Sequence, residues 1–330
     1  MSGSYRTINY SLRPAKTIER KMLCEVFHRL YPFGKIENYR YIGFGSIYFS
    51  DFQLFHRNLG IDNMLSIEKD AYAKECFEFN KPYKCITIDY RKSSEVLPEL
   101  DMSSKSIVWL DYESKLDESI LSDVCTVCAK AGSGSLLIVT FNVYTDRNPD
   151  EEQKKAYTEQ TGMEYNVDDY ALHEFRKRLG DAVPRELKGT DLRGKGVGKI
   201  SRNILKSRIA EAFSARNGVL LTENKLVQRQ IINFLYTDGA PMMTLGWIFY
   251  ETSEENKLDA CSFNELNFVR YEDTAYNIKV PCLTSKEMRH LNAQLPRGET
   301  VNLPGVPTDD IETYAELYRY FPAFVEAIYT

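Results

Sequence analysis

The sequence YRYIGFGS at residues 39–46 joins a short apolar run to a turn with two glycines. Residues 39–42 have the character of a strand, and a helical pattern follows the turn. Ligands of α/β proteins bind at the carboxyl end of such a strand, where Gly43 and Gly45 allow close approach to the backbone. The third glycine of a pyrophosphate-binding GxGxxG turn is absent, because residues 47–49 are Ile-Tyr-Phe. Taken alone, the turn is as typical of an ordinary tight turn as of a ligand site.

The segments after this turn alternate between strand-like and helical patterns. The further strand-like runs are residues 64–67, 85–88, 106–110 and 135–141, and the helical runs are 51–59, 71–79 and 118–131. Such alternation predicts a parallel sheet covered by helices on both faces. Two later β-rich runs, 225–236 and 243–252, are joined by a turn that contains Asp238-Gly239, which predicts an antiparallel hairpin. We therefore predict an α/β fold with a Rossmann-like sheet of parallel strands closed by an antiparallel hairpin.

Changes in pattern divide the chain into three parts. Residues 1–36 form a predicted helical lead-in, and residues 37–252 form the Rossmann-like domain. Within that domain, about residues 142–222 are long, charged and helix-prone, which indicates a helical insertion. Residues 253–330 alternate prolines with helical patterns and are predicted to be a helical C-terminal extension.

Three of the predicted parallel strands end in an acidic residue. Glu68 follows the second strand, Asp89 the third and Asp111 the fourth. A carboxylate after the second strand can accept hydrogen bonds from both ribose hydroxyls, and one after the third can accept the adenine amino group. One such acid is typical of a solvated turn, but three in register favour an adenosyl site.

In its glycine turn and in the three acids that follow its strands, the sequence resembles the class I S-adenosylmethionine-dependent methyltransferases over about residues 37–251. The resemblance implies S-adenosylmethionine as the cofactor. The cofactor-binding residues that it implies are Gly43 and Gly45 in the turn, Phe44 and Ser46 on the methionine side, Glu68 at the ribose and Asp89 at the adenine. A narrower likeness, carried by YIGFGS at 41–46 and YRYFP at 318–322, is to bacterial "putative O-methyltransferase" proteins, several of which are encoded beside anti-phage genes.

The resemblance also implies where catalysis takes place. Methyl transfer needs an acceptor held in line with the methyl group and, for some acceptors, removal of a proton. Asp111 and Tyr112 are the predicted catalytic residues that orient the acceptor. Asp111 could instead hold a divalent ion with Asn142 or Asp146, as in catechol-type enzymes, but such sparse oxygen ligands are common at strand ends and we predict no metal.

Two features depart from the family pattern. Tyr41 stands where many members have an acidic residue, so the contact to the methionine amino group has no assigned partner. The run Asp111-Tyr112-Glu113 differs from the Asn/Asp-Pro-Pro-Tyr motif of enzymes that methylate amino groups of DNA bases. This difference argues against an enzyme of that kind.

A basic segment stands out within an acidic chain. Residues 176–208 contain eleven Lys or Arg against three acids, whereas the whole chain has a net charge of −5. Such a stretch could grip the phosphates of nucleic acid or of a nucleotide. The alternative is a solvated helix face that pairs with acidic surface elsewhere. The segment has no aromatic residue for stacking on a base, which weakens the case for single-strand binding.

Composition limits the remaining classes. The longest apolar runs fall short of the ~18 residues that cross a bilayer, and the polar N-terminus lacks the apolar core of a secretory signal. Seven scattered cysteines, including a lone pair at Cys125 and Cys128, are typical of a reducing compartment. We predict a cytoplasmic protein without a membrane partner.

Three hypotheses of function follow. The first is S-adenosylmethionine-dependent methyl transfer to an unidentified acceptor. The alternative is a catalytically weak or inactive adenosyl-binding or docking module, with a protein partner, of a bacterial antiviral defence complex. The third, a nicotinamide-dependent oxidoreductase, is disfavoured by the missing third glycine and by the predicted hairpin.

Overall fold

The computed structural model describes residues 13–69, 71–218, 220–296 and 303–322. Its centre is one eight-stranded sheet with the order β3-β2-β1-β4-β5-β7-β6-β8. The strands are β1 (Arg40–Gly43), β2 (Asn63–Ile67), β3 (Ile86–Asp89), β4 (Ser106–Lys115), β5 (Leu136–Asn142), β6 (Leu226–Thr237), β7 (Pro241–Glu251) and β8 (Tyr276–Ile278). The first five strands are parallel, and β7 is antiparallel to both β5 and β6. The predicted fold class is thus confirmed, and β8, which pairs with β6, is an addition.

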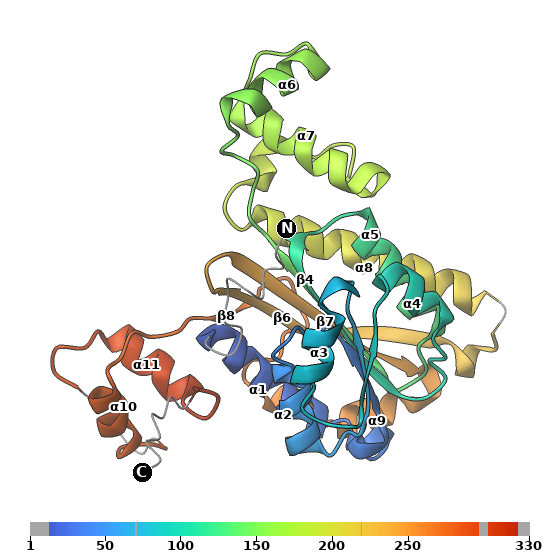
Figure 1. The fold of residues 1–330 in the computed structure, drawn as a ribbon, viewed down its shortest axis with the longest axis vertical. Coiled ribbons are helices and arrows are strands. Elements are labelled where there is room, and N and C mark those ends of the chain that lie inside the picture. Colours follow the sequence, from blue (N-terminus) through green and yellow to red (C-terminus); the bar gives the residue numbers. More distant parts are fainter. Residues whose placement is uncertain (1–12, 70, 219, 297–302, 323–330) are drawn as a thin grey trace.

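Two helical layers cover the sheet (Figure 1). Side chains from α1 (Pro14–His28), α2 (Ser50–Leu59) and α3 (Lys74–Asn80) share one hydrophobic core with Ile107 and Trp109 of β4. On the other face, α4 (Ser93–Glu99), α5 (Glu118–Lys130) and α8 (Gly196–Asn217) share a second core with Val108 and Leu110. The alternation along β4 follows from the two-residue period of a strand. Side chains of successive strand residues therefore belong to opposite faces of the sheet.

The segment between β5 and β6 has two parts. α6 (Glu151–Thr161) and α7 (Val167–Leu179) project away from the sheet as an arm (Figure 1). α8 lies within the range predicted as an insertion, yet it packs against α5, with Leu205 and Ile209 fully buried. The segments that leave the layers of the sheet are therefore the arm and the loops at its two ends.

The C-terminal part carries α9 (Glu255–Ala260), α10 (Ser285–Asn292) and α11 (Thr308–Leu317). Leu291, Ile311 and Tyr314 form a small core of their own, and α10 and α11 stand to one side of the sheet (Figure 1). Short 3-10 helices complete the chain at Tyr31–Phe33, Ile36–Asn38, Ala71–Ala73, Gly180–Ala182, Gly189–Leu192, Thr222–Asn224, Thr252–Glu254 and Phe263–Glu265. Among the described residues, no helix is both long and apolar enough to cross a membrane.

Candidate functional site

The glycine turn after β1 is packed tightly against its own strands. A Cβ atom on Gly43 would lie 2.7 Å from the Tyr41 hydroxyl oxygen, and one on Gly45 would lie 2.8 Å from the Ser66 hydroxyl oxygen. Ser46 and Phe49 both have left-handed backbone conformations, with φ of 47° and 45°. Packing within the turn therefore requires both glycines, whether or not a ligand also approaches them.

Glu68, directly after β2, lies against this turn. The Gly45 amide donates to the Ser66 hydroxyl oxygen at 3.0 Å, and the Ser66 hydroxyl donates to Glu68 Oε1 at 2.8 Å. Glu68 is only 8% exposed, and burial raises its pKa to about 7, although Ser66 and the amides of Gly45 and Ser46 favour the ionised form. The structure therefore brings the predicted Gly45, Ser46 and Glu68 together. Ser66 was missed by the sequence analysis.

The other predicted cofactor residues face different partners. Asp89 accepts two hydrogen bonds from Arg91, at 3.0 and 2.8 Å, which lowers the pKa of the Asp89 carboxyl. Its backbone lies beside Glu68, since the Glu68 amide donates to the Asp89 carbonyl at 2.9 Å. The ring of Phe44 packs edge-on against Tyr112, with ring centroids 5.2 Å apart. Asp89 and Phe44 thus border the Glu68 cluster without hydrogen bonding to it through their side chains.

A buried acid lies close to Gly43, although Tyr41 occupies the position at which the family pattern has one. The Tyr41 hydroxyl donates to Asp51 Oδ2, and Asp51 sits in the first turn of α2 with 7% exposure. Burial raises the pKa of Asp51, and the positive charge of Arg20 opposes that rise. Asp51 is therefore a second carboxyl group beneath the turn that sequence analysis missed.

Asp111 of β4 lies in a buried charged cluster with α1. The Lys16 ammonium donates to Asp111 Oδ1 at 2.8 Å, lies 2.8 Å from Glu19 Oε2 and donates to the Tyr236 hydroxyl oxygen at 3.2 Å. It also sits 4.4 Å from the centroid of the Trp109 ring. Burial alone would lower the pKa of Lys16, but the charges of Asp111 and Glu19 raise it above its usual value. Lys16 is thus a fixed cation, and Asp111, with 29% of its side chain exposed, is the accessible member of the cluster.

Glu19 extends this cluster into the sheet. Its Oε1 accepts from the Thr244 hydroxyl, which lies 2.8 Å from the Thr140 hydroxyl oxygen. The Trp109 indole then donates to the Thr140 hydroxyl oxygen at 3.0 Å. A continuous polar chain therefore joins α1 to β4, β5 and β7. Lys16, Glu19 and the two threonines were not among the site residues predicted from the sequence.

Tyr112 points to the opposite face of β4. Its hydroxyl donates to Asp123 Oδ2 on α5 at 2.6 Å, and the Ser93 hydroxyl donates to the same oxygen at 2.5 Å. Burial raises the pKa of Tyr112 well above its usual value. The structure therefore separates the two predicted catalytic side chains, because adjacent strand residues face opposite sides.

The alternative metal ligands have partners from the protein. Asp146 accepts hydrogen bonds from Lys115 and from Arg178, and Asn142 Oδ1 accepts the Tyr144 amide at 2.7 Å. In the part of the chain that the structure describes, no group of three or more His, Cys, Asp or Glu side chains is placed to hold a metal ion.

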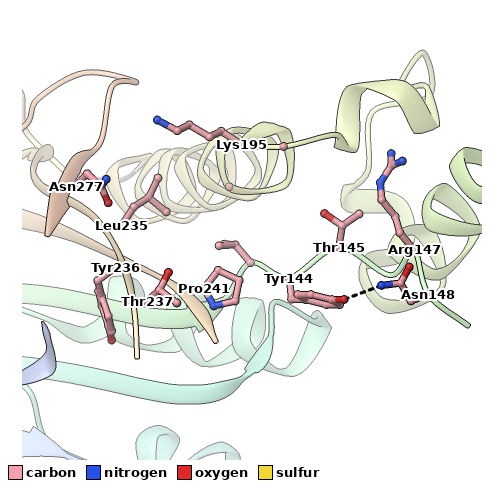
Figure 2. Close-up of a pocket in the computed structure, with 13 residues that line it drawn as sticks. Tyr144, Thr145, Arg147, Asn148, Lys195, Leu235, Tyr236, Thr237, Pro241 and Asn277 are labelled. Carbon is pink, nitrogen blue, oxygen red and sulfur yellow. Dashed lines mark hydrogen bonds between the residues drawn. The ribbon is translucent and has the colours of Figure 1, made fainter. Parts of the chain in front are cut away.

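A pocket of about 520 Å³ opens beyond the carboxyl ends of β5 and β6. Residues 143–148 after β5, the start of α8 and the β6–β7 hairpin provide its walls (Figure 2). Tyr236 lines this pocket and also contacts Lys16 through its hydroxyl. The pocket and the Asp111 cluster are therefore neighbours that share one side chain.

Three residues of the predicted basic segment, Gly194, Lys195 and Gly198, line this pocket, and acids pair with other parts of the segment. Arg178 binds Asp146, Arg193 binds Asp168 and Arg208 lies 3.0 Å from Glu211. Lys195 is exposed and lines the pocket. The segment is thus partly a paired helix surface, which was the alternative interpretation, and partly a wall of the pocket.

Comparison with known families gives one match over almost the whole chain. A family model with the description "Putative O-methyltransferase" matches residues 8–329. No protein of curated function matches the sequence.

Three solved structures that resemble the chain are remote from it in sequence. Spermidine synthase from Thermotoga maritima is 11% identical, with 79% of this chain and 67% of that one covered and a TM-score of 0.38. Trm1 from Pyrococcus horikoshii, solved with S-adenosyl-L-methionine, is 11% identical, with 74% and 57% covered and a TM-score of 0.41. A "putative O-methyltransferase" from Klebsiella pneumoniae is 14% identical, with 73% and 81% covered and a TM-score of 0.36.

Proposed function

Since the chain belongs to the "Putative O-methyltransferase" family, whose model matches residues 8–329, we propose that it transfers a methyl group from S-adenosylmethionine to a hydroxyl oxygen of a small acceptor. Family membership confirms the methyltransferase class predicted from the sequence. The cofactor's contacts, the acceptor and the roles of individual residues are our proposal, and they rest on the arrangement of side chains at the carboxyl edge of the sheet.

The observation that carries the proposal is the buried Glu68 carboxyl group beneath the glycine turn. Burial of a carboxylate is costly unless donors surround it, and here burial raises the pKa to about 7. Two ribose hydroxyls would supply two more donors and favour the ionised form. Glu68 with Gly45 and Ser66 therefore fits the adenosyl part of the cofactor.

The charges around the turn also fit a cationic cofactor. Asp51 interacts electrostatically with Glu68, Asp111 and Arg20, and Asp111 interacts with Glu19. This group of interacting residues therefore has four carboxyl groups and two cations, Lys16 and Arg20. The carboxyl groups are those of Glu19, Asp51, Glu68 and Asp111. S-adenosylmethionine carries a sulfonium and an ammonium against one carboxylate, so an excess of acidic groups favours its binding. We propose Asp51 as the partner of the ammonium group, the contact that Tyr41 left unassigned.

Asp111 is the residue that we propose to orient the acceptor. Lys16 holds Oδ1, while Oδ2 receives no hydrogen bond from any described residue. Oδ2 can thus accept the hydrogen bond of an acceptor hydroxyl and take its proton as the oxygen becomes methylated. When bound, the cofactor would supply a methyl group on a sulfonium sulfur, and that sulfur would become a neutral thioether as the methyl passes to the acceptor oxygen. A role for Tyr112 in orienting the acceptor stays a prediction. In the structure its hydroxyl donates to Asp123.

Calorimetric titration of the full chain tests the proposal. We expect micromolar binding of S-adenosylmethionine and S-adenosylhomocysteine, no binding of NAD, and loss of both adenosyl ligands in Glu68→Ala. Asp111→Asn is the matched variant, because it keeps the contacts of Glu68 with the glycine turn, and S-adenosylhomocysteine, which has no sulfonium charge, should bind it like the parent protein. Failure of the parent chain to bind either adenosyl compound would overturn the proposal. Binding without methylation of any acceptor would favour the docking module.

A further inference from the structure

We propose that the pocket beside Tyr236 binds the acceptor, and that this acceptor joins a planar ring to an anionic group, a carboxylate or a phosphate. The inference rests on the proposed methyl transfer and names its substrate class. The pocket volume of about 520 Å³ lies within the range of about 300–1,000 Å³ typical of small-molecule sites. Its position beyond the ends of β5 and β6 places it at the edge of the sheet where α/β proteins bind ligands.

One wall of the pocket suits a planar ring. Figure 2 shows Tyr144, Thr237 and Pro241 along one side of the space, with Lys195 across from them. Tyr144 is 46% exposed, and its hydroxyl oxygen accepts the Asn148 side-chain amide at 3.1 Å, which fixes the direction of the ring. An exposed aromatic ring held in place and flanked by proline is a surface on which another ring can stack.

The surroundings of the pocket carry an excess of positive charge. Arg147, which lines the pocket, lies 2.6 Å from Asp168 and shares this single carboxylate with Arg193. Lys115, whose ammonium lies 5.4 Å from the centroid of the Tyr144 ring, shares Asp146 with Arg178 in the same way. Each acid thus meets two bases, which leaves one positive charge in each group.

Lys195 adds a third positive charge, directly on the pocket wall. It is exposed and forms no ion pair within the described part of the chain. The carboxylate of the adjacent hairpin, Asp238, is turned to α1, where Oδ2 accepts the Lys16 amide at 2.9 Å. The pocket therefore favours an anionic ligand over a neutral one of the same shape.

The start of α8 reinforces this preference. The helix has 22 residues, begins at Gly196 and has neither a side-chain cap nor an acidic residue in its first turn. The Gly196 amide donates to the Arg193 carbonyl at 2.8 Å, but the positive end of the helix dipole still favours an anion. Gly198 lines the pocket without a side chain that would cover this end of the helix, and a Cβ there would lie 3.0 Å from the Met243 methyl carbon.

Calorimetric titration with three probes tests the inference on the full chain. The probes are 3,4-dihydroxybenzoate, phenyl phosphate and the neutral 4-methylcatechol, each titrated with and without S-adenosylhomocysteine. We expect at least one anionic probe to bind ten-fold tighter or more than 4-methylcatechol. Lys195→Gln should lower the affinity for that probe about five-fold and leave 4-methylcatechol unchanged. Lys199→Gln, which removes an exposed lysine of α8 outside the pocket wall, is the matched control and should change neither affinity.

The outcomes separate this inference from the proposed function. Equal binding of anionic and neutral probes, or no binding of either anionic probe, would overturn the inference even where S-adenosylhomocysteine binds. An equal loss in Lys195→Gln and Lys199→Gln would also overturn it, because the effect would then be one of general charge. Lys195→Gln, unlike Lys199→Gln, could weaken binding of the anionic probe in a chain that binds no adenosyl compound. That result would uphold the anion site and overturn the methyl-transfer proposal.

Discussion

The two ends of the site are held together by different kinds of interaction. At the glycine turn, one carboxyl group is held by a serine hydroxyl and the backbone within residues 45–68. At β4, Lys16 contacts Asp111, Glu19 and Tyr236, and the last of these is 220 residues away in the chain. The first end depends on neighbouring strands and neutral donors, whereas the second depends on compensation of buried charge. A single substitution at the glycine turn should therefore change ligand binding. A single substitution in the Lys16 cluster at β4 should also change the stability of the fold.

The largest expected effect is on stability, in Lys16→Met. Two carboxyl groups would lose their common cation, and removal of one partner from a buried ion pair costs about 3–5 kcal/mol. We expect a loss of this size in the free energy of unfolding measured with urea. The double variant Lys16→Met/Glu19→Gln should recover about 2 kcal/mol, because it removes one of the uncompensated acids. No loss in the single variant would show that the cluster does not stabilise the fold.

Asp111→Asn should give the next largest effect, on catalysis. An amide cannot take the proton of the acceptor hydroxyl, and general-base catalysis contributes about 10²-fold or more. We expect methyl transfer, followed with tritium-labelled S-adenosylmethionine, to fall by about that factor, with cofactor affinity within about two-fold of the parent value. A parental rate in this variant would show that Asp111 is not the base.

Glu68→Gln should have a smaller effect, on cofactor affinity. Hydrogen bonds to a charged group are worth about 1.5–3 kcal/mol, so we expect a loss of about ten-fold or more. The Glu68 pKa of about 7 implies that affinity in the parent protein rises from pH 6 to pH 8, as the carboxylate becomes ionised. The Gln variant should show no such rise in calorimetric titrations. A flat profile in the parent protein would contradict the role of Glu68 at the ribose.

The same pKa shift has an opposite effect on the fold without ligand. The folded pKa of about 7 lies above the ordinary value of 4.5, so the folded state binds the proton more tightly than the unfolded state. Glu68 therefore makes the unliganded fold less stable as pH rises between these two values. Urea unfolding at pH 5 and pH 8 should show this decrease, and it should be reduced in Glu68→Gln.

The smallest effect is expected for Tyr112→Phe. Its hydroxyl donates to Asp123 on the face of β4 opposite Asp111, so methyl transfer should remain within about three-fold of the parent rate. Asp123 would keep the Ser93 hydroxyl, and the lost hydrogen bond should cost about 1–2 kcal/mol of unfolding free energy. A fall in rate like that of Asp111→Asn would restore the predicted catalytic role of Tyr112.

The sheet could be predicted because its signals are local. Each parallel strand is a short apolar run before a polar turn, and Asp238-Gly239 marks the hairpin. β8 was missed because its three residues, Tyr276–Ile278, are too few to form a pattern and are set by pairing with β6. The packing of α8 on the sheet likewise depends on contacts with α5 that its charged sequence conceals.

The candidate site could be predicted only in part. Glu68 and Gly45 were found because strand ends and glycine turns can be recognised one by one. Glu19 carries a signal that could have been used, since it lies between Ile18 and Met22 on the buried stripe of α1, where a charge is unusual. The pocket could not have been found, because its walls come from segments as distant as Tyr144, Lys195 and Asn277.

The contact of Lys16 with Tyr236 has a consequence for the order in which the chain assembles. During synthesis β1 to β5 can pair with one another before β6 is complete, since all five strands end by Asn142, and only the pairing of β5 with β7 must follow later. The Lys16 ammonium can contact Tyr236, and the Lys16 amide can contact Asp238, only after the hairpin has been synthesised. A nascent chain can therefore form the turn that we assign to the cofactor early, while the acceptor end becomes competent only after late, long-range contacts have closed.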